Sequence, residues 1–193
     1  TYEIPRLIQK TIKTLEAFPR HIDAIIGYID FPATSILPIV CQSFGLPSPS
    51  LESVLKCQHK YSSRVQQKRV IPEHIPVFRA FNPFADDALS QIDLPYPFWI
   101  KPIKAAGSYL GFRVNNQTDF NRAIAIIRRE LHRVGDAFNQ ILEYTRLPDE
   151  IAYVDGNFCL AESIIGGRQC TVEGYVHQGE LGFHGTVDSI RYR

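Results

Sequence analysis

Lys101 is the residue whose type and position are most suggestive of chemistry. It follows Phe98, Trp99 and Ile100 in an apolar run that predicts a strand. An ammonium group buried there without a partner is costly, because it loses its hydration. Three arrangements would avoid that cost: binding of an anion, pairing with a carboxylate, or extension of the side chain to the edge of the sheet.

The segment after Lys101 supports an anion site. Lys104, Gly107, Ser108 and Gly111 surround a corner of small residues between two apolar runs. Small residues let backbone N–H groups approach a phosphate, and a serine hydroxyl adds a donor. A hairpin turn needs glycine in any case, so the corner by itself predicts only the turn. The pattern is not that of a Walker P-loop.

Two strands and a helix would position this corner. Residues 98–103 and 110–114 predict a hairpin. Apolar residues then recur at helical spacing between positions 120 and 134, behind a cap at Thr118. Three further strands are predicted at residues 158–164, 170–176 and 181–190, separated by glycine turns.

The first half of the chain predicts mostly helix. An amphipathic helix is expected at residues 4–15, followed by a strand at residues 22–28 and a helix at residues 31–44 that Gly45 ends. Ser48 and Pro49 are expected to open a further helix, and another is expected at residues 59–68. Residues 71–97 are rich in proline and predict a loop with a short helix near residues 86–92.

Composition excludes several classes of protein. The chain has 193 residues, with 21 Lys and Arg against 20 Asp and Glu, so its net charge of +1 gives no general attraction to nucleic acid or to an anionic membrane. No apolar stretch approaches the roughly 20 residues that span a bilayer. The four cysteines form no Cys-x-x-Cys pair, and we expect them to be reduced thiols of a cytoplasmic protein.

The order of strand, lysine, small-residue loop and strand resembles the phosphate-covering hairpin of the ATP-grasp superfamily, close to its biotin carboxylase and carbamoyl phosphate synthetase branch. Other segments are similar to that family in the same order. Gln58-His-Lys60-Tyr-Ser-Ser-Arg64 resembles the Asp-Lys-x-x-x-(Lys/Arg) start of a helix whose lysine reaches ATP phosphates. Ala161-Glu-Ser-Ile-Ile165 resembles the Glu-x-x-(Ile/Leu) hinge that holds adenine, and Gly167 to Glu173 resembles the strand that follows it.

The resemblance implies a role for each matching residue. Lys60 and Lys101 would bind phosphate oxygens, and Gly107 and Ser108 would lie in a mobile flap over the phosphates. Ile165 would offer its backbone to the adenine edge. Glu162 would mark the adenine side of the hinge and accept the exocyclic amine or the ribose, unless it is a solvated carboxylate at a strand end.

The sequence leaves two roles open for Glu173 and Asp188. They would be nucleotide-site or substrate-side groups, or they would pair structurally with Arg168, Arg191 or Arg193. The sequence also departs from the family pattern, since His59 stands where aspartate is common and Gln169 where many members have glutamate. The flap has fewer glycines than that of biotin carboxylases.

The resemblance implies an α/β protein with an ATP-grasp fold of two lobes, preceded by the last βα unit of a Rossmann-like domain. The expected parts are the end of that domain at residues 1–46, a linker and first ATP-grasp segment at 47–97, a small ATP-binding lobe at 98–164, and the start of an incomplete large lobe at 165–193.

The implied activity is that of an ATP-dependent ligase. ATP would phosphorylate a small-molecule carboxylate, and a nucleophile, usually an amine, would capture the acyl phosphate; a carboxylate-thiol ligase and a ligase that uses bicarbonate stay open as variants. We expect no metal ligand among these residues, because the family's Mg²⁺ carboxylates would lie beyond residue 193. A homodimer is compatible with the resemblance, whereas nucleic acid and membrane are not expected as partners. The alternative is a catalytically inactive nucleotide-binding or scaffolding module that works through a partner.

Overall fold

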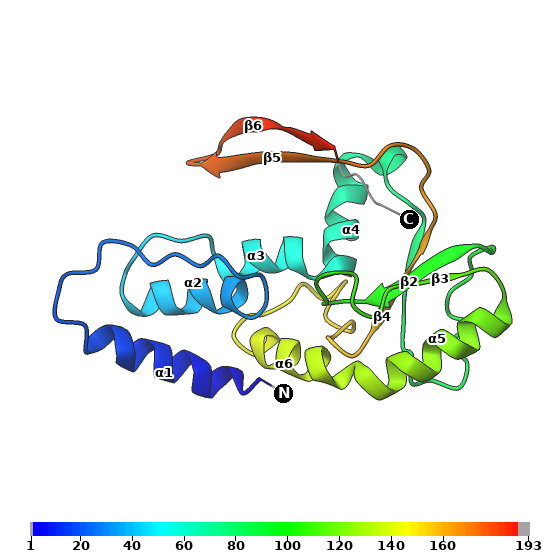
Figure 1. The fold of residues 1–193 in the computed structure, drawn as a ribbon, viewed down its shortest axis with the longest axis horizontal. Helices are drawn as coiled ribbons and strands as arrows, with labels where there is room; N and C mark the ends of the chain where they lie inside the picture. The colour runs from blue at the N-terminus through cyan, green and yellow to red at the C-terminus, as the bar shows by residue number, and fades with distance from the viewer. Residues whose placement is uncertain (1, 189–193) are drawn as a thin grey trace.

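The structure is a computed structural model that describes residues 2–188. It is an α/β protein with two antiparallel sheets, and its elements follow the chain from α1 to β6 (Figure 1). The elements are α1 (Ile4–Glu16), α2 (Ala33–Ser43), α3 (Leu51–Gln58), α4 (Lys60–Val70), the 3₁₀ helix η1 (Pro72–His74), β1 (Phe78–Phe81), β2 (Phe98–Pro102), β3 (Phe112–Val114), α5 (Gln117–Glu130), α6 (His132–Leu142), β4 (Cys159–Ser163), β5 (Cys170–His177) and β6 (Glu180–Asp188).

A four-stranded sheet in the order β1-β4-β2-β3 carries one of the two hydrophobic cores. Its strands alternate, so that Phe98 and Ile100 of β2 are buried in this core together with apolar residues of α5, while Trp99 between them is exposed. Trp99 lies directly opposite Glu162 of β4, and Lys101 lies opposite Leu160. Lys101 and Glu162 therefore share the face of the sheet that points away from α5.

The second core lies among helices from both halves of the chain. Ile4 and Ile8 of α1 contribute to it, as do Val40 of α2, Leu55 of α3 and Phe138 of α6. Leu160 of β4 belongs to the same cluster. The helical N-terminal half and the sheet are therefore held together by shared burial.

The hairpin of β5 and β6 stands apart from the four-stranded sheet (Figure 1). Its two strands pair with each other, and a β-bulge lies at Glu173 and Gly174. Almost every side chain along both strands is exposed, including Tyr175 and Phe183.

Most of the predicted elements are confirmed. The N-terminal helix, the helix ending before Gly45, the two helices that follow, and the hairpin around residues 103–111 are all present. The three strands of the last third are also present up to residue 188; the predicted end at Ile190 lies outside the described residues. None of the described helices has the length and apolar character needed to cross a membrane.

The predicted strand at residues 22–28 is wrong. This segment is irregular, with Ile26 89% and Tyr28 95% exposed. A strand is stable only when another strand pairs with its N–H and C=O groups, and within residues 2–188 no strand lies beside it. The helix of the expected βα unit forms without its strand.

Several local predictions also need correction. The caps are Ser50 rather than Ser48, and Asn116 rather than Thr118. The apolar residues up to position 134 belong to two helices, because α5 ends at Glu130 and α6 begins at His132. Residues 86–92 form turns instead of a helix, and the proline-rich segment contains β1, which the sequence did not predict.

Candidate functional site

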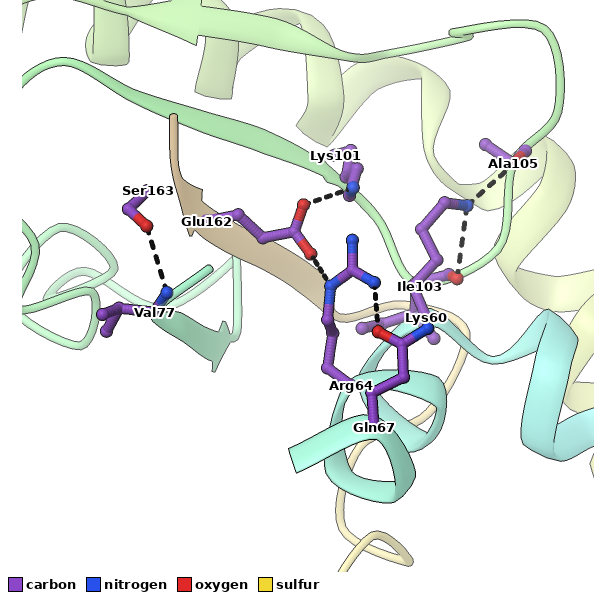
Figure 2. A network of polar contacts seen from close by, with 9 residues as sticks. All are labelled: Lys60, Arg64, Gln67, Val77, Lys101, Ile103, Ala105, Glu162 and Ser163. Carbon is purple, nitrogen blue, oxygen red and sulfur yellow. Dashed lines mark hydrogen bonds and ion pairs between the residues drawn. The ribbon is translucent and has the colours of Figure 1, made fainter. Parts of the chain in front are cut away.

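Cationic side chains from two elements converge on the face of the sheet that points away from α5. Lys60 and Arg64 come from the first two turns of α4, and Lys101 comes from β2 (Figure 2). Figure 2 shows Arg64 and Lys101 approaching the Glu162 carboxylate from either side, with the Lys60 side chain directed toward the turn after β2. The structure therefore brings together three of the predicted site residues, Lys60, Lys101 and Glu162.

His59 sets the start of α4 and hence the positions of Lys60 and Arg64. Its ring is fully buried, Nδ1 accepts a hydrogen bond from the Ser62 backbone N–H at 3.1 Å, and Nε2 lies 2.8 Å from the Val154 carbonyl oxygen. The neutral ring with its proton on Nε2 satisfies both contacts. His59 thus performs the N-cap role that suits an aspartate at this position, and burial lowers its pKa.

Lys60 is held against the backbone of the turn after β2. Its Nζ donates to the Ala105 carbonyl oxygen at 2.9 Å and to the Ile103 carbonyl oxygen at 3.5 Å. Burial lowers the pKa of Lys60 to about 8, and the nearby charges of Lys104 and Lys101 act in the same direction. The carboxylates of Asp30 and Glu162 act in the opposite direction but do not cancel this effect. The ammonium is therefore mostly protonated at neutral pH, and a bound anion would stabilise its charged form.

Glu162 is held between two cations. Its Oε1 accepts from Arg64 Nε at 2.5 Å, its Oε2 accepts from Lys101 Nζ, and Arg64 also donates to Gln67 at 2.6 Å. The Glu162 side chain is 7% exposed, so the interpretation as a solvated carboxylate is wrong. Of the three arrangements considered for Lys101, the structure has the pairing with a carboxylate.

The turn between β2 and β3 adjoins this cluster through Ala105. Gly107 has a φ of 59° and Ser108 a φ of 61°, and both are exposed. Gly107 suits this left-handed conformation, which a side chain disfavours. The Gly111 N–H donates to the Ser108 carbonyl oxygen at 3.0 Å. Among the described residues, no side-chain hydrogen bond involves Ser108.

The structure does not bring the remaining two predicted residues into the cluster. Ile165 follows β4 and is 65% exposed, and Glu173 is exposed on β5 of the separate hairpin. Asp188 pairs with Arg168, in agreement with the structural interpretation, whereas Arg191 and Arg193 lie outside the described residues. The roles of Ile165 and Glu173 toward a nucleotide stay predictions.

Sequence reasoning did not assign a contact with the ligand to Arg64 or Lys104. Arg64 was visible as the final position of the helix-start pattern, and Lys104 was named only as a neighbour of the small-residue corner. Lys104 is 3% exposed, its Nζ lies 2.9 Å from Asp30 Oδ1, and it sits 5.5 Å from the centre of the Phe31 ring. The sequence could not predict the pairing of Lys104 with Asp30, because Asp30 is 74 residues away in the chain.

Positive charge predominates in the assembled site. The site contains four cations, Lys60, Arg64, Lys101 and Lys104, and the described ion pairs provide two carboxylates for them, Glu162 and Asp30. The described residues contain no group of three His, Cys, Asp or Glu side chains that could hold a metal ion. The arrangement is suited to a polyanion such as a di- or triphosphate.

The comparisons with known proteins concern the fold. No protein-family model matches the sequence. No curated protein sequence matches it either.

Solved structures do match. An L-amino acid ligase from Bacillus licheniformis superposes with a TM-score of 0.64 at 18% identity, over 94% of this chain and 36% of that one. A D-alanine-D-alanine ligase from Coxiella burnetii gives 0.60 at 14% identity, over 89% of this chain and 46% of that one. A D-Ala:D-Ser ligase from Enterococcus faecalis gives 0.55 at 18% identity, over 79% and 38%.

This chain thus spans less than half the length of each of these three proteins. Identities this low establish the fold alone, so the predicted biotin carboxylase and carbamoyl phosphate synthetase branch stays a prediction. The chain has the ATP-grasp fold.

Proposed function

We propose that this chain is the ATP-binding part of an ATP-dependent ligase that activates a carboxylate through an acyl phosphate. The observation that carries the proposal is the cluster of Lys60, Arg64 and Lys101 on the face of the sheet that points away from α5, with more cations than carboxylates. The fold supports it, because the three matching structures described above are all named ligases.

In this proposal the chain's own residues bind and orient the triphosphate. Lys60 and Lys101 contact phosphate oxygens, and the exposed N–H groups of the turn at Gly107 and Ser108 cover them. A single charge contact at about 4 Å is worth on the order of 4 kcal/mol at an effective dielectric of about 20, before desolvation. Fixed cations also stabilise the charge that develops on the transferred phosphoryl group.

The proposed reaction has two steps. A carboxylate oxygen of the acid attacks the γ-phosphorus, the bond to the bridging oxygen of ADP breaks, and an acyl phosphate forms. A nucleophile such as an amine then attacks the acyl carbon and releases inorganic phosphate, while the proton of the amine passes to a base or to water. The final product contains a bond between the acyl carbon of the acid and the attacking atom of the nucleophile.

Mg²⁺ belongs to the proposal as an ion that accompanies ATP. The residues described here do not fit a resident magnesium site, since no acidic cluster is present among them and both oxygens of Glu162 are engaged by Lys101 and Arg64. We assign no step to the ion. The expectation that its ligands lie beyond residue 193 stays a prediction.

Calorimetric titration of the 193-residue chain with ATP and with ADP, each with and without Mg²⁺, tests the proposal. We expect binding that Lys60→Met weakens by about tenfold or more, which corresponds to about 1.4 kcal/mol. Because the pKa of Lys60 in the free protein is about 8, ATP affinity should fall as the pH rises above that value, and Lys60→Met should remove this dependence.

Lys68→Met is a matched control, because Lys68 is on the same helix but lines a different cavity, near β1. It should bind ATP like the unaltered chain. Absence of heat with either nucleotide at millimolar concentration, or equal losses from Lys60→Met and Lys68→Met, would contradict the proposal.

A further inference from the structure

A cavity of about 720 Å³ adjoins the cation cluster on the side of the N-terminal half. Its volume lies within the range of about 300–1,000 Å³ that is typical of small-molecule sites. It is bounded by the segments that lead into α1 and α2, the turn after β2, and the start of α6. The lining residues that matter here are Tyr2, Phe31, Lys104, Ala105, Tyr109 and Arg133.

The cavity and the proposed phosphate site share Ala105. The Ala105 carbonyl oxygen accepts the hydrogen bond from Lys60 Nζ at 2.9 Å, and Ala105 also lines the cavity. Lys104 lines the cavity as well, and its charge contributes to the lowered pKa of Lys60. A ligand in the cavity would therefore lie next to the group that we place on the phosphates.

The charges around the cavity favour an anionic ligand. Lys104 and Arg133 line it, and no carboxylate is among the residues that do. Lys104 Nζ forms an ion pair with Asp30, and Arg133 Nε lies 3.1 Å from a carboxylate oxygen of Glu130. An ammonium has three donors and a guanidinium five, so both groups retain donors for a carboxylate.

Aromatic rings form the apolar part of the same cavity. Tyr2 and Phe31 meet edge to face with their ring centres 6.2 Å apart, and Tyr109 is 37% exposed on the turn. Such rings offer edges and faces to another ring, and ring pairs of this kind stabilise a complex beyond the burial of apolar area.

We propose that this cavity binds the acid substrate, and that the substrate is a carboxylic acid that carries an aromatic ring. Its carboxylate contacts Lys104 and Arg133, and its ring packs among Tyr2, Phe31 and Tyr109. The role as substrate site rests on the function proposed above, whereas binding of such an acid does not.

A second cavity provides an internal control. It measures about 680 Å³, lies between α4 and β1, and is also lined by cations and tyrosines, among them Arg79 and Tyr153. Ala105 and Lys104 are absent from its lining, so it lacks the connection to the Lys60 cluster. Because both cavities are lined by an arginine and by tyrosines, Arg79 is the matched control for Arg133.

The test is an NMR titration of the 193-residue chain with 3-phenylpropionate, without nucleotide. We expect saturable shifts at residues 104–109, with affinity at least about tenfold higher than for propionate, which lacks the ring, or for 2-phenylethylamine, which lacks the carboxylate. Arg133→Gln should weaken binding about fivefold or more, since a charged hydrogen bond is lost, and Arg79→Gln should leave it unchanged.

Two further variants keep the test informative. Lys104→Gln removes the ion pair of a buried lysine with Asp30 and is expected to destabilise the chain, so Tyr109→Ala, at an exposed position, provides the second test of the cavity. Binding of 3-phenylpropionate that Arg79→Gln weakens and Arg133→Gln does not would overturn the proposal. Equal affinity for 2-phenylethylamine, or no binding of the acid, would overturn it too.

A separate ATP titration distinguishes the two proposals. If ATP binds and 3-phenylpropionate does not, the function stands and the substrate class is wrong. If the acid binds as expected and ATP does not, the cavity stands as a site for an aromatic acid while the ligase function fails.

Discussion

Glu162 decides how the cations of the site are arranged. Its carboxylate lies between Arg64 Nε and Lys101 Nζ, so α4 and the sheet meet through one buried acid. The acid offsets part of the repulsion among the cations and fixes Lys101 in one place before any ligand binds. Such preorganisation lowers the cost of binding, because the ligand does not have to order the lysine.

Lys101→Met tests whether this lysine serves an anion as well as Glu162. Glu162 would keep Arg64 as a partner, so we expect a loss of about 1–2 kcal/mol in the free energy of unfolding, below the roughly 3–5 kcal/mol typical of a buried charge left unpaired. ATP affinity should fall by about tenfold or more. Denaturant unfolding and calorimetry measure the two effects.

Glu162→Gln is the matched variant for Lys101→Met. It removes the negative charge but keeps both cations, so ATP affinity should hold or rise while stability falls. A large loss of stability in Lys101→Met with unchanged ATP affinity would leave Lys101 a purely structural cation.

His59 links the protonation of one buried ring to the start of α4. Its folded pKa is lowered, first by burial and also by the charge of Lys60, whereas Asp155 and the hydrogen bond to Val154 act in the opposite direction. The unfolded chain takes up a proton at about pH 6.5, and the folded chain does so only at lower pH. Stability should therefore be fully present above about pH 6.5 and decline as the pH falls below it.

The measurement is urea unfolding at about pH 7.5 and about pH 5.5 for the unaltered chain and for His59→Asn, whose side chain can still cap the helix. We expect the unaltered chain to lose more stability on acidification than the variant. Equal losses in the two proteins would show that other groups cause the pH dependence.

At the scale of elements, α4 and the turn after β2 depend on each other. Lys60 contributes its backbone N–H to the Ile103 carbonyl oxygen at 3.1 Å and its side chain to Ala105. Beyond Ala105 the turn is exposed and is closed by its own backbone hydrogen bonds, such as that from Tyr109 to Ala106 at 3.1 Å. Segments with few buried contacts open at low free-energy cost.

Hydrogen exchange tests the turn as a cover for the phosphates. Amides of residues 106–109 should exchange quickly in the free chain and slow on addition of ATP, because phosphate oxygens would accept from them. Amides of β2, which already pair with β3 and β4, serve as the internal control and should change little. Bound ATP with unchanged exchange at residues 106–109 would remove the turn from the site.

At the scale of the whole molecule, the site lies where two hydrophobic cores adjoin. One core joins the sheet to α5, the other joins α1, α2, α3 and α6, and Leu160 of β4 belongs to the second while Cys159 and Ala161 belong to the first. The proposed phosphate site and the cavity beside it therefore involve both halves of the chain. The β5–β6 hairpin, which carries Glu173, lies outside both cores.

The sequence by itself determined the features that depend on neighbours along the chain. The helical spacing of Ile4, Ile8 and their successors predicted α1, and the apolar runs around a small-residue corner predicted the β2–β3 hairpin. The position of Lys101 in such a run marked it as a residue in need of a partner. These signals are local, because period and turn chemistry act over a few residues.

Tertiary structure alone decided the features that depend on distant residues. β1 forms because Phe78–Phe81 pairs with β4, about 80 positions later, whereas the equally apolar residues 22–28 stay irregular without a strand beside them. Glu162 meets Arg64 across 98 positions and Lys101 across 61. Strand pairing and buried ion pairs require two surfaces to meet, and sequence periodicity contains no information on which surfaces do so.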